Sequence, residues 1–385
     1  MRQIQEAEQP KERRRKQIRF WNPGNFYDFT LLFLVIFLVG FGLVMVYSAS
    51  SYTAALDHNG DSAYFLKRQA VFAVLGLAVM FFVSLVDYHI LKKFTVIGFL
   101  VISALLLVTL IAGSAGGAGE GSTRWIELGP IRFQPSELAK LVIIMYVAYA
   151  ATQQVWKLND WKVLAKIMVP PLIIIGLIVK ENLSTAIICG VITIAILFVA
   201  SPKYWHFFVI GIAAVIGGVA MVLLESYRGD RFDAWLNVET HPKGYQTLQS
   251  LYAIGSGGLW GKGLGQSIQK MDFIPEVQND MIFSVICEEL GLVGGIALIL
   301  LFVFLIWRLM VVITNASDLY GSLLVVGVMA HVSVQVLINI AVVTNTIPNT
   351  GIPLPFISYG GTSLVFLLIE MGIVLSVARQ IKIRK

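Results

Sequence analysis

The chain has 385 residues, of which 57% are hydrophobic and 14% are charged, and its net charge is +6 at neutral pH. Soluble domains contain about half apolar and a quarter charged residues, so this composition excludes a soluble domain and indicates an integral membrane protein. The basic residues do not form one patch with interleaved aromatic residues, which argues against a nucleic-acid-binding protein. Cys189 and Cys287 both lie in apolar runs, so neither a disulfide nor a cysteine metal site is expected.

The predicted organisation is one polytopic, all-α membrane domain over residues 27–378. Residues 1–26 are polar and basic and lack the apolar region of a signal peptide, so we expect a cytoplasmic tail there and a second tail at 379–385. A spanning helix needs about 20 predominantly apolar residues. Ten stretches meet this requirement, near residues 27–50, 69–86, 94–113, 134–152, 163–179, 184–201, 205–225, 281–307, 319–344 and 357–378.

The distribution of Lys and Arg predicts how the spans are oriented. With the N-terminus inside, eighteen of these residues fall in cytoplasmic segments and ten on the opposite side. Positive residues accumulate in cytoplasmic loops, so both termini are expected inside. The long polar loop 226–280 then faces the extracytoplasmic side. Loops of this length are usually functional or disordered, and its aromatic and aliphatic residues argue against disorder.

Acidic residues also occur in and beside the spans, where charge is costly and usually faces a bundle interior or a water-filled cavity. Glu137 and Lys140 share one face of the fourth span, so we predict an ion pair that locks two helices, lines a substrate cavity, or does both. Asp280 lies where the eighth span begins, and its simplest interpretation is a helix N-cap. Glu288 lies about 80° around that helix from Asp280, so both could border one cavity.

The outer loop also holds a candidate anion site. Its Gly-rich run 255–265 lacks the spacing of a P-loop, but Gly-rich backbone lets main-chain N–H groups approach an anion. A flexible turn with solvated charges is the alternative. The candidate substrate- or pyrophosphate-binding residues are Arg228, Arg231, Lys243, Lys262, Lys270, Tyr245, Gln246, Gln249 and Ser250.

Five motifs follow one another along the chain: Gln134-Pro-Ser-Glu-Leu-Ala-Lys140, Gly244-Tyr-Gln, Pro275-Glu before Asp280, Glu288-Glu-Leu-Gly291, and Gly351-Ile-Pro-Leu-Pro-Phe-Ile-Ser-Tyr-Gly-Gly-Thr-Ser363. Together they resemble the SEDS family (shape, elongation, division and sporulation), whose members include FtsW, RodA and SpoVE. The resemblance covers nearly the whole chain, and Val285-Ile-Cys-Glu-Glu favours the FtsW-like branch over RodA. Asn182 and Asn349 depart from the family's usual Asp and Val. The polar run 180–185 is therefore expected only to cap a helix.

The resemblance implies a peptidoglycan glycosyltransferase of the bacterial plasma membrane, with its active site facing outward. Its substrate would be lipid II, a disaccharide-pentapeptide on undecaprenyl pyrophosphate. Its partners would be a class B penicillin-binding protein, which is a transpeptidase, and other elongation or division proteins. Asp280 matches the family's essential aspartate. The family's loop motif corresponds to Pro355, Ser358, Tyr359, Gly360, Gly361 and Thr362.

The residues suit this chemistry. A lipid pyrophosphate is already a good leaving group, so an inverting single displacement needs one base and nearby cations but no general acid. No cofactor is required, although a divalent cation is compatible with the reaction. A helix N-terminus and lysines would lower the pKa of Asp280, whereas burial would raise it, and the sequence leaves this balance open. Two other functions also stay open: a lipid II transporter lined by Glu137, Lys140 and Glu288, and a non-catalytic scaffold for the transpeptidase.

Overall fold

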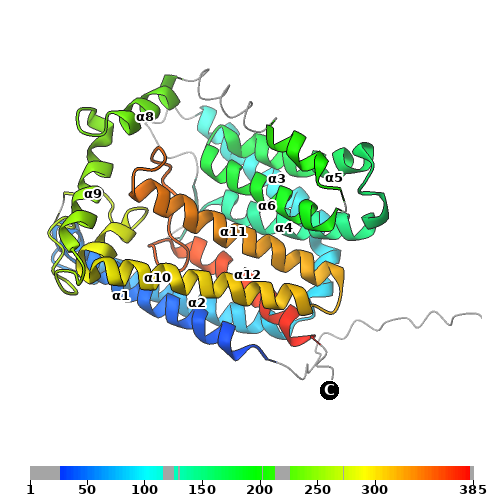
Figure 1. Cartoon of the computed structure of the whole chain (residues 1–385), viewed down its shortest axis with the longest axis horizontal. Helices are drawn as coiled ribbons and strands as arrows, with labels where there is room; N and C mark the ends of the chain where they lie inside the picture. Colours follow the sequence, from blue (N-terminus) through cyan, green and yellow to red (C-terminus); the bar gives the residue numbers. More distant parts are fainter. Residues whose placement is uncertain are drawn as a thin grey trace, which may run out of the picture.

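The computed structural model describes residues 27–115, 125–128, 131–201, 203–212, 226–271 and 273–381, so most of the two predicted tails lies outside it. Within these ranges the chain forms a bundle of long helices that run along the long axis of the molecule (Figure 1). The spanning-length helices are α1 (Phe29–Asp57), α2 (Tyr64–Leu85), α3 (Leu91–Ala115), α4 (Pro135–Gln153), α5 (Trp161–Val179), α6 (Leu183–Ala200), α10 (Ile282–Asn315), α11 (Leu319–Val343) and α12 (Gly361–Arg379).

Shorter elements lie between these helices. They are η1 (Tyr88–Ile90), η3 (Val155–Lys157), α8 (Ser226–Leu236), η4 (Pro242–Gly244), α9 (Tyr245–Gly257) and an antiparallel pair of strands, β1 (Ile126–Leu128) and β2 (Ile131–Phe133). The sequence did not predict the strand pair. α8 and α9 lie together at one end of the bundle, and α12 ends at the opposite end (Figure 1).

The described helices agree with about ten membrane spans. Eight of them are long and apolar enough to cross a membrane. α4 has a polar first turn and is not among the eight, but it packs against α3, α6 and α11 inside the bundle. The seventh predicted span is helical over residues 205–212, and most of it lies outside the described residues. The prediction of an all-α polytopic membrane protein is confirmed.

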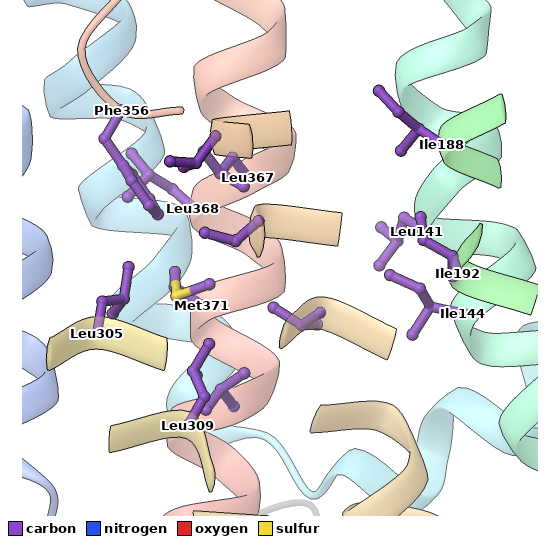
Figure 2. Close-up of a cluster of buried hydrophobic side chains, with 14 of the residues drawn as sticks. Leu141, Ile144, Ile188, Ile192, Leu305, Leu309, Phe356, Leu367, Leu368 and Met371 are labelled. Carbon is purple, nitrogen blue, oxygen red and sulfur yellow. The ribbon is translucent and has the colours of Figure 1, made fainter. Parts of the chain in front are cut away.

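α11 occupies the centre of the bundle and packs against α4, α6, α10 and α12. Helix association within a membrane depends on close van der Waals packing, because lipid tails are as apolar as the side chains. Figure 2 shows this packing as two groups of buried aliphatic and aromatic side chains on either side of α11. One group contains Leu141, Ile144, Ile188 and Ile192, and the other contains Leu305, Leu309, Phe356, Leu367, Leu368 and Met371.

Residues 351–360, here called the re-entrant segment, enter the bundle as irregular backbone. The tenth span was predicted to begin at residue 357, but α12 begins at Gly361. Pro353 and Pro355 have no N–H to donate, which disfavours a helix here. Gln335 of α11 donates from Nε2 to the Pro353 carbonyl oxygen at 2.9 Å. Irregular backbone at membrane depth is tolerated where protein surrounds it and satisfies its polar groups.

Within the outer segment, residues 226–280, α9 and the loop that follows it pack against α10. Gly291 has φ 70° and ψ −172° and interrupts α10. The loop after α9 fills this break: the Lys262 N–H donates to the Glu288 carbonyl oxygen and the Leu292 N–H to the Gly258 carbonyl oxygen, both at 2.9 Å. A Cβ on Gly261 would lie 2.2 Å from the Glu289 carbonyl oxygen, so glycine is required for this close approach. The Gly-rich run therefore packs main chain against α10, and the N–H groups of Lys262 and Gly263 do not face an anion.

The polar run 180–185 caps a helix, as expected. Asn182 is the N-cap of α6, and its Oδ1 accepts a hydrogen bond from the Thr185 N–H at 3.1 Å. The departure from the family's usual Asp is therefore compatible with a structural role at this turn, because Asn and Asp are both good N-cap residues.

Candidate active site

Asp280 lies at the end of the outer segment, one residue before the N-cap of α10, which is Met281. Its Oδ1 accepts a hydrogen bond from Gln246 Nε2 at 3.4 Å. Its Oδ2 lies beside the re-entrant segment, 3.7 Å from where a Cβ on Gly351 would be. The interpretation of Asp280 as an N-cap is wrong, because α10 has no side-chain cap. The carboxylate instead lies where α9, α10 and the re-entrant segment meet.

Burial decides the balance that the sequence left open, since it raises the pKa of Asp280 to about 6. Repulsion from Glu276 acts in the same direction, whereas a hydrogen bond with its own backbone, the positive charge of Arg231 and the bond from Gln246 lower the pKa. The carboxylate is therefore mostly ionised at neutral pH and is a stronger base than an exposed aspartate. A base whose pKa lies near the working pH is well suited to general base catalysis.

A series of hydrogen bonds connects Asp280 to α8. Asn349 donates from Nδ2 to Gln246 Oε1 at 3.2 Å, and Arg231 donates from Nη1 to the Asn349 carbonyl oxygen at 3.3 Å. Gln246 thus contacts both Asp280 and Asn349, and Arg231 is brought to the same corner of the structure. Asn349 departs from the family's usual Val, and its side chain contributes one of these hydrogen bonds.

Asn339 is a residue of this site that the sequence motifs did not predict. It is buried on α11, and its Nδ2 donates to the Asp280 carbonyl oxygen at 2.7 Å and to the Ile352 carbonyl oxygen at 2.8 Å. One signal could have revealed it: His331, Gln335 and Asn339 are spaced by four residues in an apolar span, which places three polar side chains on one helix face.

The structure brings only part of the predicted basic group to Asp280. Arg231 lies near it, and Lys243 forms an ion pair with Asp230 at 3.0 Å on the exposed surface. Lys262 pairs with Glu288 at 2.7 Å, and the buried Lys270 pairs with Glu289 at 2.8 Å. The expectation that both lysines bind substrate is corrected, because a buried carboxylate requires a charged or hydrogen-bonding partner. The Arg228 side chain lies outside the described residues.

Glu288 holds the outer segment to α10 and does not share a cavity with Asp280. Besides pairing with Lys262, it accepts hydrogen bonds from the Ser267 hydroxyl and from the Ile268 N–H, the latter at 3.1 Å. Its side chain is completely buried. The expectation of a cavity acid is therefore corrected, since these donors enclose the carboxylate.

The predicted polar residues of α9 differ in their surroundings. Tyr245 is exposed, Gln246 contacts Asp280 as described, and Gln249 is half-buried. Ser250 is buried, and its hydroxyl donates to the Gln246 carbonyl oxygen at 3.0 Å. Ser250 is 0% exposed, so its hydroxyl is not accessible to substrate in this structure.

The Glu137–Lys140 ion pair is present, with 2.9 Å between Oε1 and Nζ. Both side chains are buried, and the Ser363 hydroxyl donates to Glu137. Glu137 also lines a cavity of about 20 Å³ with His331, Gln335 and residues of the re-entrant segment, including Pro355, Ser358 and Gly360. A cavity of that size holds about one water molecule, so the pair joins helices beside a small cavity.

The loop motif fixes the re-entrant segment to its surroundings. Gln69 of α2 bonds both the Ser358 carbonyl oxygen and the Gly360 N–H at 3.2 Å. The Tyr359 N–H donates to the Gln278 carbonyl oxygen at 2.9 Å. A Cβ on Gly361 would lie 2.5 Å from the Phe72 ring, and the Thr362 hydroxyl donates to the Arg132 carbonyl oxygen at 3.3 Å.

Known proteins resemble this chain over most of its length. Residues 29–383 match the FtsW/RodA/SpoVE family, described as cell cycle proteins. Stage V sporulation protein E of Bacillus subtilis is 39% identical over 359 residues, covering 91% of this chain and 97% of the relative. The probable peptidoglycan glycosyltransferase FtsW of Trichlorobacter lovleyi is 38% identical over 361 residues, covering 93% and 94%.

Solved structures share the fold. A chain from a peptidoglycan synthase complex, studied for its coordination of polymerization and crosslinking, matches with a TM-score of 0.75 and 27% identity, covering 92% of this chain and 98% of the other. The rod shape determining protein RodA of Thermus thermophilus matches with a TM-score of 0.67 and 28% identity, covering 92% and 97%.

Proposed function

Because this chain belongs to the FtsW/RodA/SpoVE family of cell cycle proteins, we infer that it is a peptidoglycan glycosyltransferase that polymerises lipid II, with Asp280 as its general base. The FtsW and SpoVE relatives support the FtsW-like branch. The observation that carries the assignment of the base is the position of Asp280. Its half-buried carboxylate caps no helix, has a raised pKa, accepts a hydrogen bond from Gln246 and lies beside the re-entrant segment.

The reaction is a single displacement at the anomeric carbon of the donor sugar. A hydroxyl oxygen of the acceptor sugar bonds to that carbon, the bond from the carbon to the lipid pyrophosphate breaks, and Asp280 takes the hydroxyl proton. The pyrophosphate leaves with its electron pair. Arg231 is a cation near the base that can stabilise the negative charge developing on the phosphate. Lys243 lies in η4, directly before α9, and its side chain is exposed.

A divalent cation could take ligands from both the protein and the substrate. Among the described residues, no group of three or more His, Cys, Asp or Glu side chains is placed to hold a metal ion. Asp280 and the pyrophosphate oxygens could share such a cation, because Mg²⁺ in phosphate-transfer sites often binds one or two carboxylates, phosphates and water.

The active site faces outward in this proposal, and a class B penicillin-binding protein transpeptidase is the partner. The charge bias of the loops supports the orientation. The synthase complex whose chain shares this fold was studied for polymerization together with crosslinking, which supports a crosslinking partner. Lipid II supplies the disaccharide, and its lipid remains in the membrane beside the site.

A transporter is less well supported. Its predicted route used Glu137, Lys140 and Glu288, but in this structure these three residues form ion pairs with one another or with Lys262. The cavity beside Glu137 holds about one water and is too small for a disaccharide. No observation favours a scaffold without catalysis.

The test is polymerisation of purified lipid II by the full chain with its transpeptidase partner. Asp280→Asn should abolish glycan strands while complex formation is unchanged. Asp233→Asn is the matched control, because Asp233 is an exposed carboxylate of the same outer segment. Wild-type rates from Asp280→Asn would refute the assignment of the base.

A further inference from the structure

The position of the Asp280 carboxylate is set more by hydrogen bonds to the surrounding backbone than by hydrogen bonds to the carboxylate itself. The one hydrogen bond to the carboxylate from another residue of the described structure, from Gln246, is long at 3.4 Å. Hydrogen bonds to neighbouring carbonyl oxygens are shorter. The Tyr359 N–H holds the Gln278 carbonyl at 2.9 Å, and Asn339 holds the Asp280 carbonyl at 2.7 Å. Short bonds constrain position more strongly, since hydrogen bonds weaken with distance and misalignment.

Asn339 joins two segments with one amide group. Its Nδ2 carries two N–H donors, and they bind the carbonyl oxygens of Asp280 and Ile352. The first carbonyl belongs to the turn that ends the outer segment, and the second belongs to the re-entrant segment beside the carboxylate. The side chain is 1% exposed, so no bulk water replaces these bonds if they are lost.

We infer that Asn339 is a positioning residue for catalysis, because it fixes Asp280 against the re-entrant segment at the distance that proton transfer from the acceptor sugar requires. This inference rests on the proposed function, in which Asp280 is the base. Losing the amide would let the turn at Asp280 move away from the re-entrant segment. A misplacement of about 1 Å can lower a rate about 100-fold, so the expected loss is in kcat.

Gln335 supplies a matched control on the same face of α11. It lies one helical turn from Asn339 and also donates from a side-chain amide to the re-entrant segment, at Pro353, but it does not contact Asp280. A purely structural role in holding that segment would be shared by both residues. A role in positioning Asp280 belongs to Asn339 alone.

The experiment measures kcat and KM for lipid II in the complex with the transpeptidase, together with the apparent Tm of each variant. Asn339→Leu removes both donors at similar size and should lower kcat about 10- to 100-fold with KM within about twofold. Gln335→Met should keep kcat within about twofold of wild type at a similar Tm. Asn339→Thr keeps one donor and should give an intermediate kcat, and it carries the test if the leucine variant does not fold.

Three results separate the failures. If Asp280→Asn remains active in the same preparation, the assignment of the base fails. If Asp280→Asn is inactive but the Asn339→Leu variant has the same kcat as Gln335→Met, only the role of Asn339 is overturned. If the leucine variant does not fold, the same comparison is made with Asn339→Thr. If Asn339→Leu raises KM and leaves kcat unchanged, Asn339 contributes to substrate binding and does not position the base.

Discussion

Replacing Asp280 with Asn should stabilise the fold at neutral pH while it abolishes activity. The folded protein holds the pKa of Asp280 at about 6, against 3.8 for an ordinary aspartate. The folded state therefore binds this proton more tightly than the unfolded state does. Stability from this group is fully present below about pH 4 and is lost as pH rises to 6. Ionised Asp280 costs the fold at most about 3 kcal/mol at pH 7, which is the difference between the two pKa values expressed as free energy.

Thermal unfolding of the purified full chain in detergent, recorded from pH 4 to 8, tests this reasoning. Asp280→Asn should unfold on the order of 5 °C above the wild type at pH 7.5, and the two curves should meet near pH 4, where the wild-type acid is neutral. The control Asp233→Asn, which changes an exposed carboxylate, should show no such difference. A gap between Asp280→Asn and wild type that is equal at pH 4 and pH 8, or a destabilised variant at pH 8, would refute the account.

Three further predictions concern activity and packing. Wild-type kcat/KM for lipid II should fall about tenfold per pH unit below pH 6, as expected for a base with the pKa of Asp280, and a rate independent of pH down to 5 would contradict this. Lys140→Met should lower stability by about 3–5 kcal/mol, because it leaves buried Glu137 unpaired, and the added change Glu137→Gln should restore much of the apparent Tm. Gly291→Ala should destabilise the fold by more than about 1–3 kcal/mol and lower the apparent Tm, because the φ of Gly291 is 70° and a Cβ would lie 2.4 Å from backbone atoms. The control Gly190→Ala should be neutral or slightly stabilising, because a Cβ there meets nothing within 4 Å.

Local signals predicted the elements that depend on neighbours in sequence. The Glu137–Lys140 pair followed from three-residue spacing on a helix, and the capping role of Asn182 followed from its position before an apolar run. Length and hydropathy located the spans, including α5, which stays helical through Pro170 and Pro171. Prolines are tolerated in membrane helices because surrounding groups satisfy the freed backbone atoms.

Partners distant in sequence were not predictable in the same way. Lys262 and Lys270 looked like ligands for an anion because they are basic and lie near glycines. Their partners are Glu288 and Glu289, which are brought to them by the break in α10. Asn339 lacked any motif, and its contact with Asp280 spans 59 positions of the chain.

The sequence by itself determined the class of protein, the approximate spans and the family, and it singled out Asp280 as the candidate base, because each of these depends on composition, periodicity or ordered motifs. Only the tertiary structure decided the environment of that acid. Burial between α9, α10 and the re-entrant segment raises its pKa, Asn339 bonds its backbone carbonyl oxygen, and Gln246 bonds its carboxylate. Desolvation and hydrogen bonding depend on which atoms surround a group in space, and those atoms come from segments that the folded bundle brings together.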